Sequence, residues 1–112
     1  MGLTTHMLDT AQGKPAAGTR FRLRGGGGHK RRLVDSYTTN VDGRTDAPLL
    51  QGGDGIGSTW ELVYLVGEYF AGQAVVQDDP PFLNEVTIRS GERRYHAPLL
   101  VSPWAHSTYR GS

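Results

Sequence analysis

The histidines are the residues of this sequence best suited to acid–base chemistry near neutral pH. There are four, and His6 in LTTHMLD and His96 in RRYHAPLLV stand inside runs predicted to be strands. A sheet core does not favour a titratable ring, so each is a candidate general acid or base. The ordinary alternative is a structural histidine that hydrogen-bonds across the sheet. Both interpretations stay open for His6 and His96 on this pattern alone.

Other polar residues are weaker candidates when they are taken singly. His29 follows four glycines, which predicts a solvated loop tip, and His106 is predicted to be an ordinary strand-face histidine. Arg44 comes just after an Asp-Gly turn in TNVDGRTDAP. Its guanidinium either forms a surface ion pair or holds the carbonyl or carboxylate oxygens of a planar substrate.

The last six residues, STYRGS, are unusual for a chain end. Termini commonly carry small or charged solvated residues, whereas Tyr109 and Arg110 belong to types that are enriched in binding surfaces. The segment is therefore either a strand that runs out or a chain end placed in a site.

Composition excludes several classes of function. The chain has no cysteine, which removes disulfides, thiolate zinc sites and cysteine nucleophiles. No histidine pair has local ligand spacing, and there is no nucleophile elbow or phosphate loop, so we expect neither a metal nor a cofactor. A net charge of +1 without a sustained basic face argues against a nucleic-acid partner. No apolar run approaches the ~20 residues of a membrane span, and no signal-peptide pattern opens the chain, so a cytoplasmic protein is expected.

Alternating hydrophobicity dominates the elements that must position these residues. In TRFRLRG the apolar Phe21 and Leu23 interleave with arginines, which is typical of a strand with one buried face, whereas TWELVYLV is apolar on both parities and predicts a central strand. The segment VGEYFAGQA has helical spacing and predicts one short helix over 66–74. We expect strands over 3–8, 19–24, 31–39, 59–66, 84–90, 93–101 and 106–110, with a further short one near 47–50. This pattern indicates a single all-β domain over residues 1–112, either a sandwich or a barrel.

Four segments, in order and from end to end, resemble the 5-hydroxyisourate hydrolases, the enzyme branch of the transthyretin family. They are LTTHMLDTAQGKPAAG, TTNVDGRTDAPLL, YHAPLLVSPW and the terminal STYRGS. The resemblance implies a prealbumin-type (transthyretin-like) β-sandwich of two four-stranded sheets with one short helix. It also implies a homotetramer, a dimer of dimers, with active sites in a channel where the dimers meet.

The activity that the resemblance implies is the hydrolysis of 5-hydroxyisourate to 2-oxo-4-hydroxy-4-carboxy-5-ureidoimidazoline in urate (purine) catabolism. Water attacks a ring carbonyl and the ring C–N bond breaks, with no metal or organic cofactor. The residues that match the catalytic positions of the family are His6, Arg44, His96 and Ser112. Those that match its substrate-binding positions are Tyr109, Arg110 and Gly111. The sequence departs from the family pattern at Met7, at His106 and in the Gly25–Gly28 run.

Three other functions compete with this interpretation. A transthyretin-like carrier would use the same fold and channel without chemistry, but it would favour an apolar channel floor over His6, Arg44 and His96. A non-catalytic sandwich module would bind partners through its exposed edge strands. A metal site built from two or three histidines is the weakest alternative.

Overall fold

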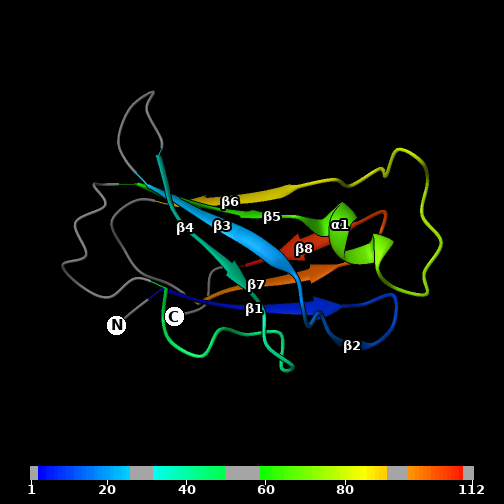
Figure 1. Cartoon of the computed structure of the whole chain (residues 1–112), viewed down its shortest axis with the longest axis horizontal. Helices are drawn as coiled ribbons and strands as arrows, with labels where there is room; N and C mark the ends of the chain where they lie inside the picture. Colours follow the sequence, from blue (N-terminus) through cyan, green and yellow to red (C-terminus); the bar gives the residue numbers. More distant parts are fainter. Residues whose placement is uncertain (1–2, 26–31, 50–58, 91–95, 110–112) are drawn as a thin grey trace.

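A computed structural model describes residues 3–25, 32–49, 59–90 and 96–109 of the chain. It is a sandwich of two four-stranded sheets with one short helix, α1, at the end of β5 (Figure 1). This confirms the β-sandwich that the family resemblance implies. It also decides between the sandwich and the barrel, which the strand pattern left open.

The first sheet has the order β2-β1-β7-β8. Its strands are β1 (Thr4–Asp9), β2 (Lys14–Pro15), β7 (His96–Val101) and β8 (His106–Thr108). The central pair β1 and β7 is parallel and lies side by side in Figure 1, with Thr4 opposite His96 and His6 opposite Pro98. Since successive side chains of a strand alternate between faces, Thr4, His6 and His96 share one face.

The second sheet has the order β4-β3-β5-β6 and is antiparallel throughout. Its strands are β3 (Arg20–Gly25), β4 (Arg32–Thr38), β5 (Trp60–Tyr64) and β6 (Val86–Ser90). All five residues of β5 are buried, which confirms the prediction of a central strand covered on both faces. Phe21 and Leu23 of β3 are fully buried, as their alternation with arginines predicted.

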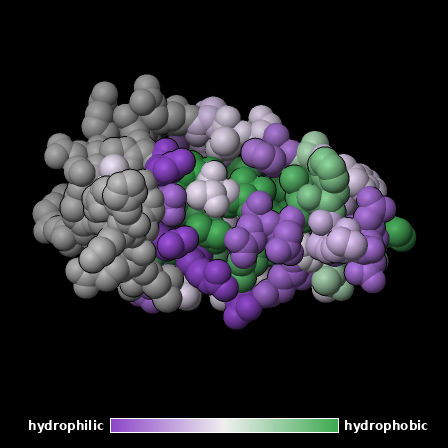
Figure 2. All heavy atoms as spheres, turned by 90° about the horizontal axis from the view of Figure 1, so that it is seen from above, coloured by the Kyte–Doolittle hydropathy of each residue, from purple (hydrophilic) through white to green (hydrophobic). Residues whose placement is uncertain are grey.

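The core lies between the two sheets and is closed at one end by the helix. Inward-facing Met7 and Leu99 of the first sheet join Leu62 and Tyr64 of the second in one buried cluster. Each such side chain contributes roughly 1.5–3 kcal/mol when it is fully removed from water. The outer surface carries both polar and apolar side chains. On the face seen in Figure 2, hydrophilic residues (purple) border hydrophobic ones (green).

Helix α1 (Val66–Ala71) ends three residues before the end of the expected 66–74, and Gly72, a weak helix former, is its C-cap residue. The buried residues Val66, Tyr69 and Phe70 have the helical spacing on which the prediction was based. The Tyr69 hydroxyl donates a hydrogen bond to Asp9 Oδ2 at 2.8 Å, which ties the helix to the end of β1. Among the described residues no helix is long and apolar enough to cross a membrane.

Most strand bounds lie within two residues of the expected ones, and three differences stand out. The two-residue strand β2 was not predicted, because a pair containing Pro15 is too short to show any period. Residues 47–49 form no strand, so the short one expected near 47–50 is absent there, while residue 50 lies outside the described part of the chain. The last strand ends at Thr108 rather than at 110, and residues 93–95 of another expected strand also lie outside the described part.

Candidate active site

Two imidazoles lie on the outer face of the first sheet. Thr4 and His96 are direct partners in the β1–β7 register, and Thr4 Oγ1 is 2.8 Å from His96 Nδ1. His6 is two residues further along β1, on the same half-buried stripe as Thr4. The parallel pairing therefore brings together two rings that lie ninety residues apart in the chain, and the threonine hydroxyl holds one of them in a fixed orientation.

The turn after β4 brings the cation of Arg44 close to the two imidazoles. The backbone N–H of Met7 donates to the carbonyl of Gly43 at 2.8 Å, and the His6 ring hydrogen-bonds the backbone of Asp42. Gly43 has a φ of +75°, and a Cβ there would collide with the Met7 carbonyl oxygen. The glycine is thus required twice, for its left-handed backbone and for its close approach to β1. Arg44 follows directly, and its charge acts on both imidazoles.

The surroundings keep both rings neutral at neutral pH. Partial burial lowers the pKa of His6 below its usual 6.5, and the Arg44 cation lowers it further, while the hydrogen bond and charge of Asp42 act in the opposite direction. Partial burial also lowers the pKa of His96, with smaller effects in the same direction from Arg44 and His6. Neutral imidazoles can accept a proton from water, so the pair is suited to general-base catalysis.

The structure brings together three of the predicted site residues, His6, Arg44 and His96. Tyr109 directly follows β8 and is 62% exposed. Strand β8 runs antiparallel to β7, in the direction of His96, and its Thr108 hydroxyl donates to the Pro98 carbonyl at 2.6 Å. Arg110, Gly111 and Ser112 lie outside the described residues.

His106 does not join the group of three. It is exposed and pairs with Val101, at the opposite end of β7 from His96. His29 lies outside the described residues. Thr4 was missed by sequence reasoning, since its contact with His96 depends on a strand register that no local pattern reveals.

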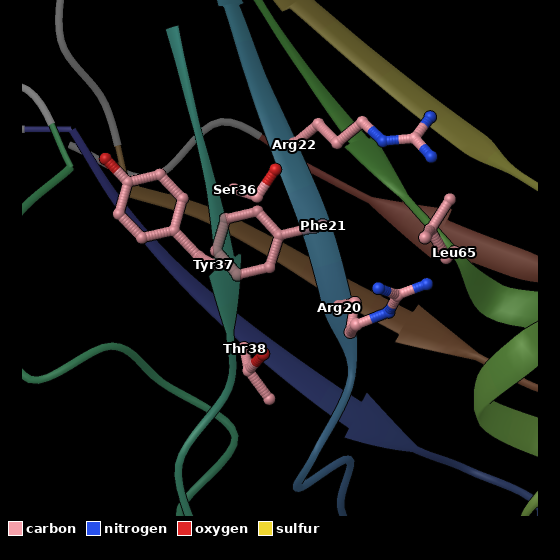
Figure 3. Close-up of a pocket in the computed structure, with 7 residues that line it drawn as sticks. All are labelled: Arg20, Phe21, Arg22, Ser36, Tyr37, Thr38 and Leu65. Atoms are coloured by element: carbon pink, nitrogen blue, oxygen red, sulfur yellow. The ribbon is translucent and has the colours of Figure 1, made fainter. Parts of the chain in front are cut away.

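A cavity of about 250 Å³ on the second sheet is a different environment (Figure 3). Arg20 and Arg22 point the same way in this view, but Arg20 is held by both carboxylate oxygens of Glu68, at 2.5 and 2.7 Å. Among the described residues no histidine or carboxylate lines the cavity. Its lining consists of Arg20, Phe21, Arg22, Ser36, Tyr37, Thr38 and Leu65. Within the described ranges, no three His, Cys, Asp or Glu side chains converge as a metal site would require.

Comparison of the sequence with known proteins agrees with the fold and with the polar site on the outer face of the first sheet. Residues 3–111 match the HIUase/Transthyretin family, and the chain belongs to that family. It is 51% identical over 115 residues to a 5-hydroxyisourate hydrolase of Deinococcus radiodurans, covering 99% of this chain and 96% of that one. The corresponding hydrolase of Mus musculus is 36% identical over 112 residues, covering 98% and 94%.

Solved structures show the same fold. A crystal structure of (S)-allantoin synthase has a TM-score of 0.87 and 42% identity, and the match covers 99% of this chain but 43% of that one. The 5-hydroxyisourate hydrolase of Klebsiella pneumoniae has a TM-score of 0.75 and 30% identity, with 99% and 93% covered. Transthyretin from Sparus aurata is only 16% identical at a TM-score of 0.81, with 97% and 95% covered, and this likeness concerns the fold alone.

Proposed function

We propose that this chain, as a single domain over residues 1–112, hydrolyses 5-hydroxyisourate in urate degradation. The observation that carries the proposal is the meeting of His6, Arg44 and His96 on one face of the first sheet. The family membership and the 51% identity to a 5-hydroxyisourate hydrolase supply the substrate. The product is 2-oxo-4-hydroxy-4-carboxy-5-ureidoimidazoline.

The chemistry follows from the charges at the site. One neutral imidazole of the His6–His96 pair takes a proton from water while the water oxygen bonds to a ring carbonyl carbon. The Arg44 guanidinium donates hydrogen bonds to the carbonyl oxygen as it becomes negative. The carbonyl then re-forms, the ring C–N bond breaks, and an imidazolium returns the proton to the leaving nitrogen. Every atom and proton is accounted for by the substrate, one water and these side chains.

The hydroxyl of Thr4 supports this scheme because it holds His96 by Nδ1. When the Nδ1–H group donates to the Thr4 hydroxyl, the ring lone pair is on Nε2, which can then accept a proton from water. A ring held in one orientation loses less freedom when it meets water and substrate, which favours proton transfer.

We further propose a homotetramer, a dimer of dimers, in which the chain end completes the site. Strand β8 is an edge strand whose three residues are all exposed, and an open edge can pair with a second copy. Tyr109, Arg110 and Gly111 would bind substrate, and Ser112 would act beside the two histidines. Light scattering after size-exclusion chromatography tests the tetramer, and a monomeric active enzyme would contradict it. A cytoplasmic location remains a prediction that cell fractionation tests.

The test of function supplies freshly generated 5-hydroxyisourate and follows its ultraviolet absorbance. We expect a decay faster than the spontaneous one and proportional to the amount of protein. Decay at the spontaneous rate, with an established hydrolase active in the same cuvette conditions, would reject the hydrolase and leave the carrier as the alternative. A tag placed after Ser112 should reduce the rate far more than a tag placed before Met1.

A further inference from the structure

The turn that carries Arg44 is organised by one side chain, that of Asn40. The amide oxygen of Asn40 accepts hydrogen bonds from the backbone N–H groups of Asp42 at 2.9 Å and Arg44 at 3.1 Å. The backbone N–H of Asn40 donates to the Arg44 carbonyl at 2.7 Å, and its own carbonyl accepts from Gly43 at 2.9 Å. Both backbone polar groups of Arg44 are therefore bound to a single residue.

The Asn40 amide is itself held in one orientation. Its Nδ2 donates to Asp46 Oδ1 at 3.0 Å, so the opposite end of the amide, Oδ1, faces the backbone of the turn. If the amide rotated by half a turn, its NH₂ group would meet two N–H donors and would place its oxygen against a carboxylate. Asp46 thus keeps the acceptor where the turn needs it.

The root of the turn is fixed to the body of the protein. Thr39, the residue before Asn40, is buried, and its hydroxyl donates to the Ala16 carbonyl at 2.6 Å and accepts from the Thr19 N–H at 2.9 Å. On the other side the Gly43 carbonyl accepts from Met7 of β1. Because the turn is fixed at both ends, a change at Asn40 should alter how Asp42 and Arg44 lie against His6 of β1.

We propose that Asn40 is a positioning residue for the hydrolysis, one that places the Arg44 guanidinium and the Asp42 carbonyl against His6, with Asp46 fixing the orientation of its amide. The inference rests on the proposed function. It extends that function to two residues, Asn40 and Asp46, whose side-chain hydrogen bonds lie within the turn segment. The energetic reason is that an unbraced five-residue turn has several closed conformations, only one of which puts Arg44 at the site.

The test is a steady-state comparison of five variants with the wild type. Asn40→Ala should lower kcat/KM by about tenfold or more, with a larger rise in KM than fall in kcat, because the displaced group binds substrate oxygens. Asn40→Asp should also lose activity, since two carboxylates then face each other at positions 40 and 46. Asp46→Asn alone should show a smaller loss, because it frees the amide to rotate.

The decisive variant is the exchange Asn40→Asp with Asp46→Asn. It keeps the net charge, lets the new carboxylate accept both backbone N–H groups, and lets the new amide at 46 donate to it. We expect kcat/KM within about threefold of the wild type. Thr45→Val is the matched control, because it removes another hydrogen bond of the same segment, to the Ala47 carbonyl, and leaves the Arg44 backbone alone. It should retain the wild-type rate.

A second readout does not depend on turnover. The titration midpoint of the His6 ring, followed by NMR, should move in Asn40→Ala. The charged and titratable groups around His6 are Arg44, Asp42 and His96.

Two results would overturn the inference: wild-type kcat/KM and an unmoved His6 midpoint in Asn40→Ala, or an exchange variant no more active than Asn40→Asp. If Asn40→Ala fails to fold, the exchange still decides. An inactive wild type would reject the proposed function, and the NMR comparison would then test Asn40 by itself.

Discussion

The outer faces of the two sheets use charge in opposite ways. On the second sheet each arginine with a described side chain lies near a glutamate, and Glu61 is nearly buried between two of them. The pairs are Arg20 with Glu68, Arg22 with Glu85, and Arg24 and Arg89 with Glu61. On the first sheet the outward positions of β1 and β7 carry imidazoles and no carboxylate in the described part, and Arg44 arrives from a turn outside the sheet.

The two faces therefore differ in whether their charged groups are available for a reaction. A guanidinium paired with a carboxylate is already satisfied, so the second face is a solvated surface. Arg44 forms no ion pair with a carboxylate of the described residues, and the rings beside it are kept neutral. An available cation next to two neutral bases is what a carbonyl hydrolysis requires. Five experiments test this contrast, in order of decreasing effect.

Removing one imidazole should abolish the function of the first face. His96→Ala removes a proposed base together with its contact to Thr4, so we expect no acceleration above the spontaneous decay of 5-hydroxyisourate. The oligomer should be unchanged by light scattering. His106→Ala is the control, since this ring is exposed at the far end of β7 and should leave the rate intact. Unchanged turnover in His96→Ala would remove this residue from the site.

Disturbing the turn should harm both stability and rate. Gly43→Ala combines a positive φ with a collision against the Met7 carbonyl, whereas Gly18→Ala has the same φ of +75° and nothing within 4 Å. Gly18→Ala should cost about 1–2 kcal/mol of unfolding free energy, measured in urea, and keep its rate. Gly43→Ala should cost more and should also lower kcat/KM. Equal behaviour of the two variants would show that the close approach to β1 has no role.

The pH dependence should report the lowered pKa values of the two rings. A proposed base must be neutral, and the pKa of each ring lies below 6.5, mainly through partial burial and then through Arg44. The rate kcat/KM should therefore be constant around pH 7 and should fall only when the pH drops below about 6.5. A fall that begins above pH 7 would mean that the rings are not kept neutral.

The same shifts make folding stability depend on pH in a defined direction. Because the unfolded chain holds the histidine protons more tightly than the folded chain, acid favours unfolding. The contribution of His6 and His96 to the free energy of unfolding is complete above the pKa of the unfolded chain and declines as the pH falls below it. Denaturant titrations at pH 7.5 and 5.5 measure it.

Breaking an ion pair on the second face should have the smallest effect. Arg20→Ala removes the contact with Glu68, and both side chains are well exposed, 60% and 50%. We expect the wild-type rate and almost the wild-type melting temperature, because exposed ion pairs are compensated by water. A loss of activity in this variant would connect the second face to the reaction and contradict the contrast between the two faces.

Much of the fold could be predicted from local pattern. Alternation located the buried Phe21 and Leu23, unbroken apolarity located β5, and helical spacing located α1. The two-residue β2 carries no period and was missed. The resemblance to a family, rather than spacing, selected His6, Arg44 and His96 as one set. Their proximity could not be computed from the chain, since it depends on which strands pair and in which register.

The fold class and the candidate residues can be inferred from the sequence: an all-β chain without cysteine, with His6 and His96 in strands and an arginine after an Asp-Gly turn. These are local properties, set by side-chain chemistry and by the two-residue period of a strand. The contact of Thr4 with His96 and the closure of the Arg44 turn by Asn40 against β1 depend on the three-dimensional fold. The parallel pairing of β1 with β7 joins segments from opposite ends of the chain, and such long-range contacts are fixed by the packing of the whole core.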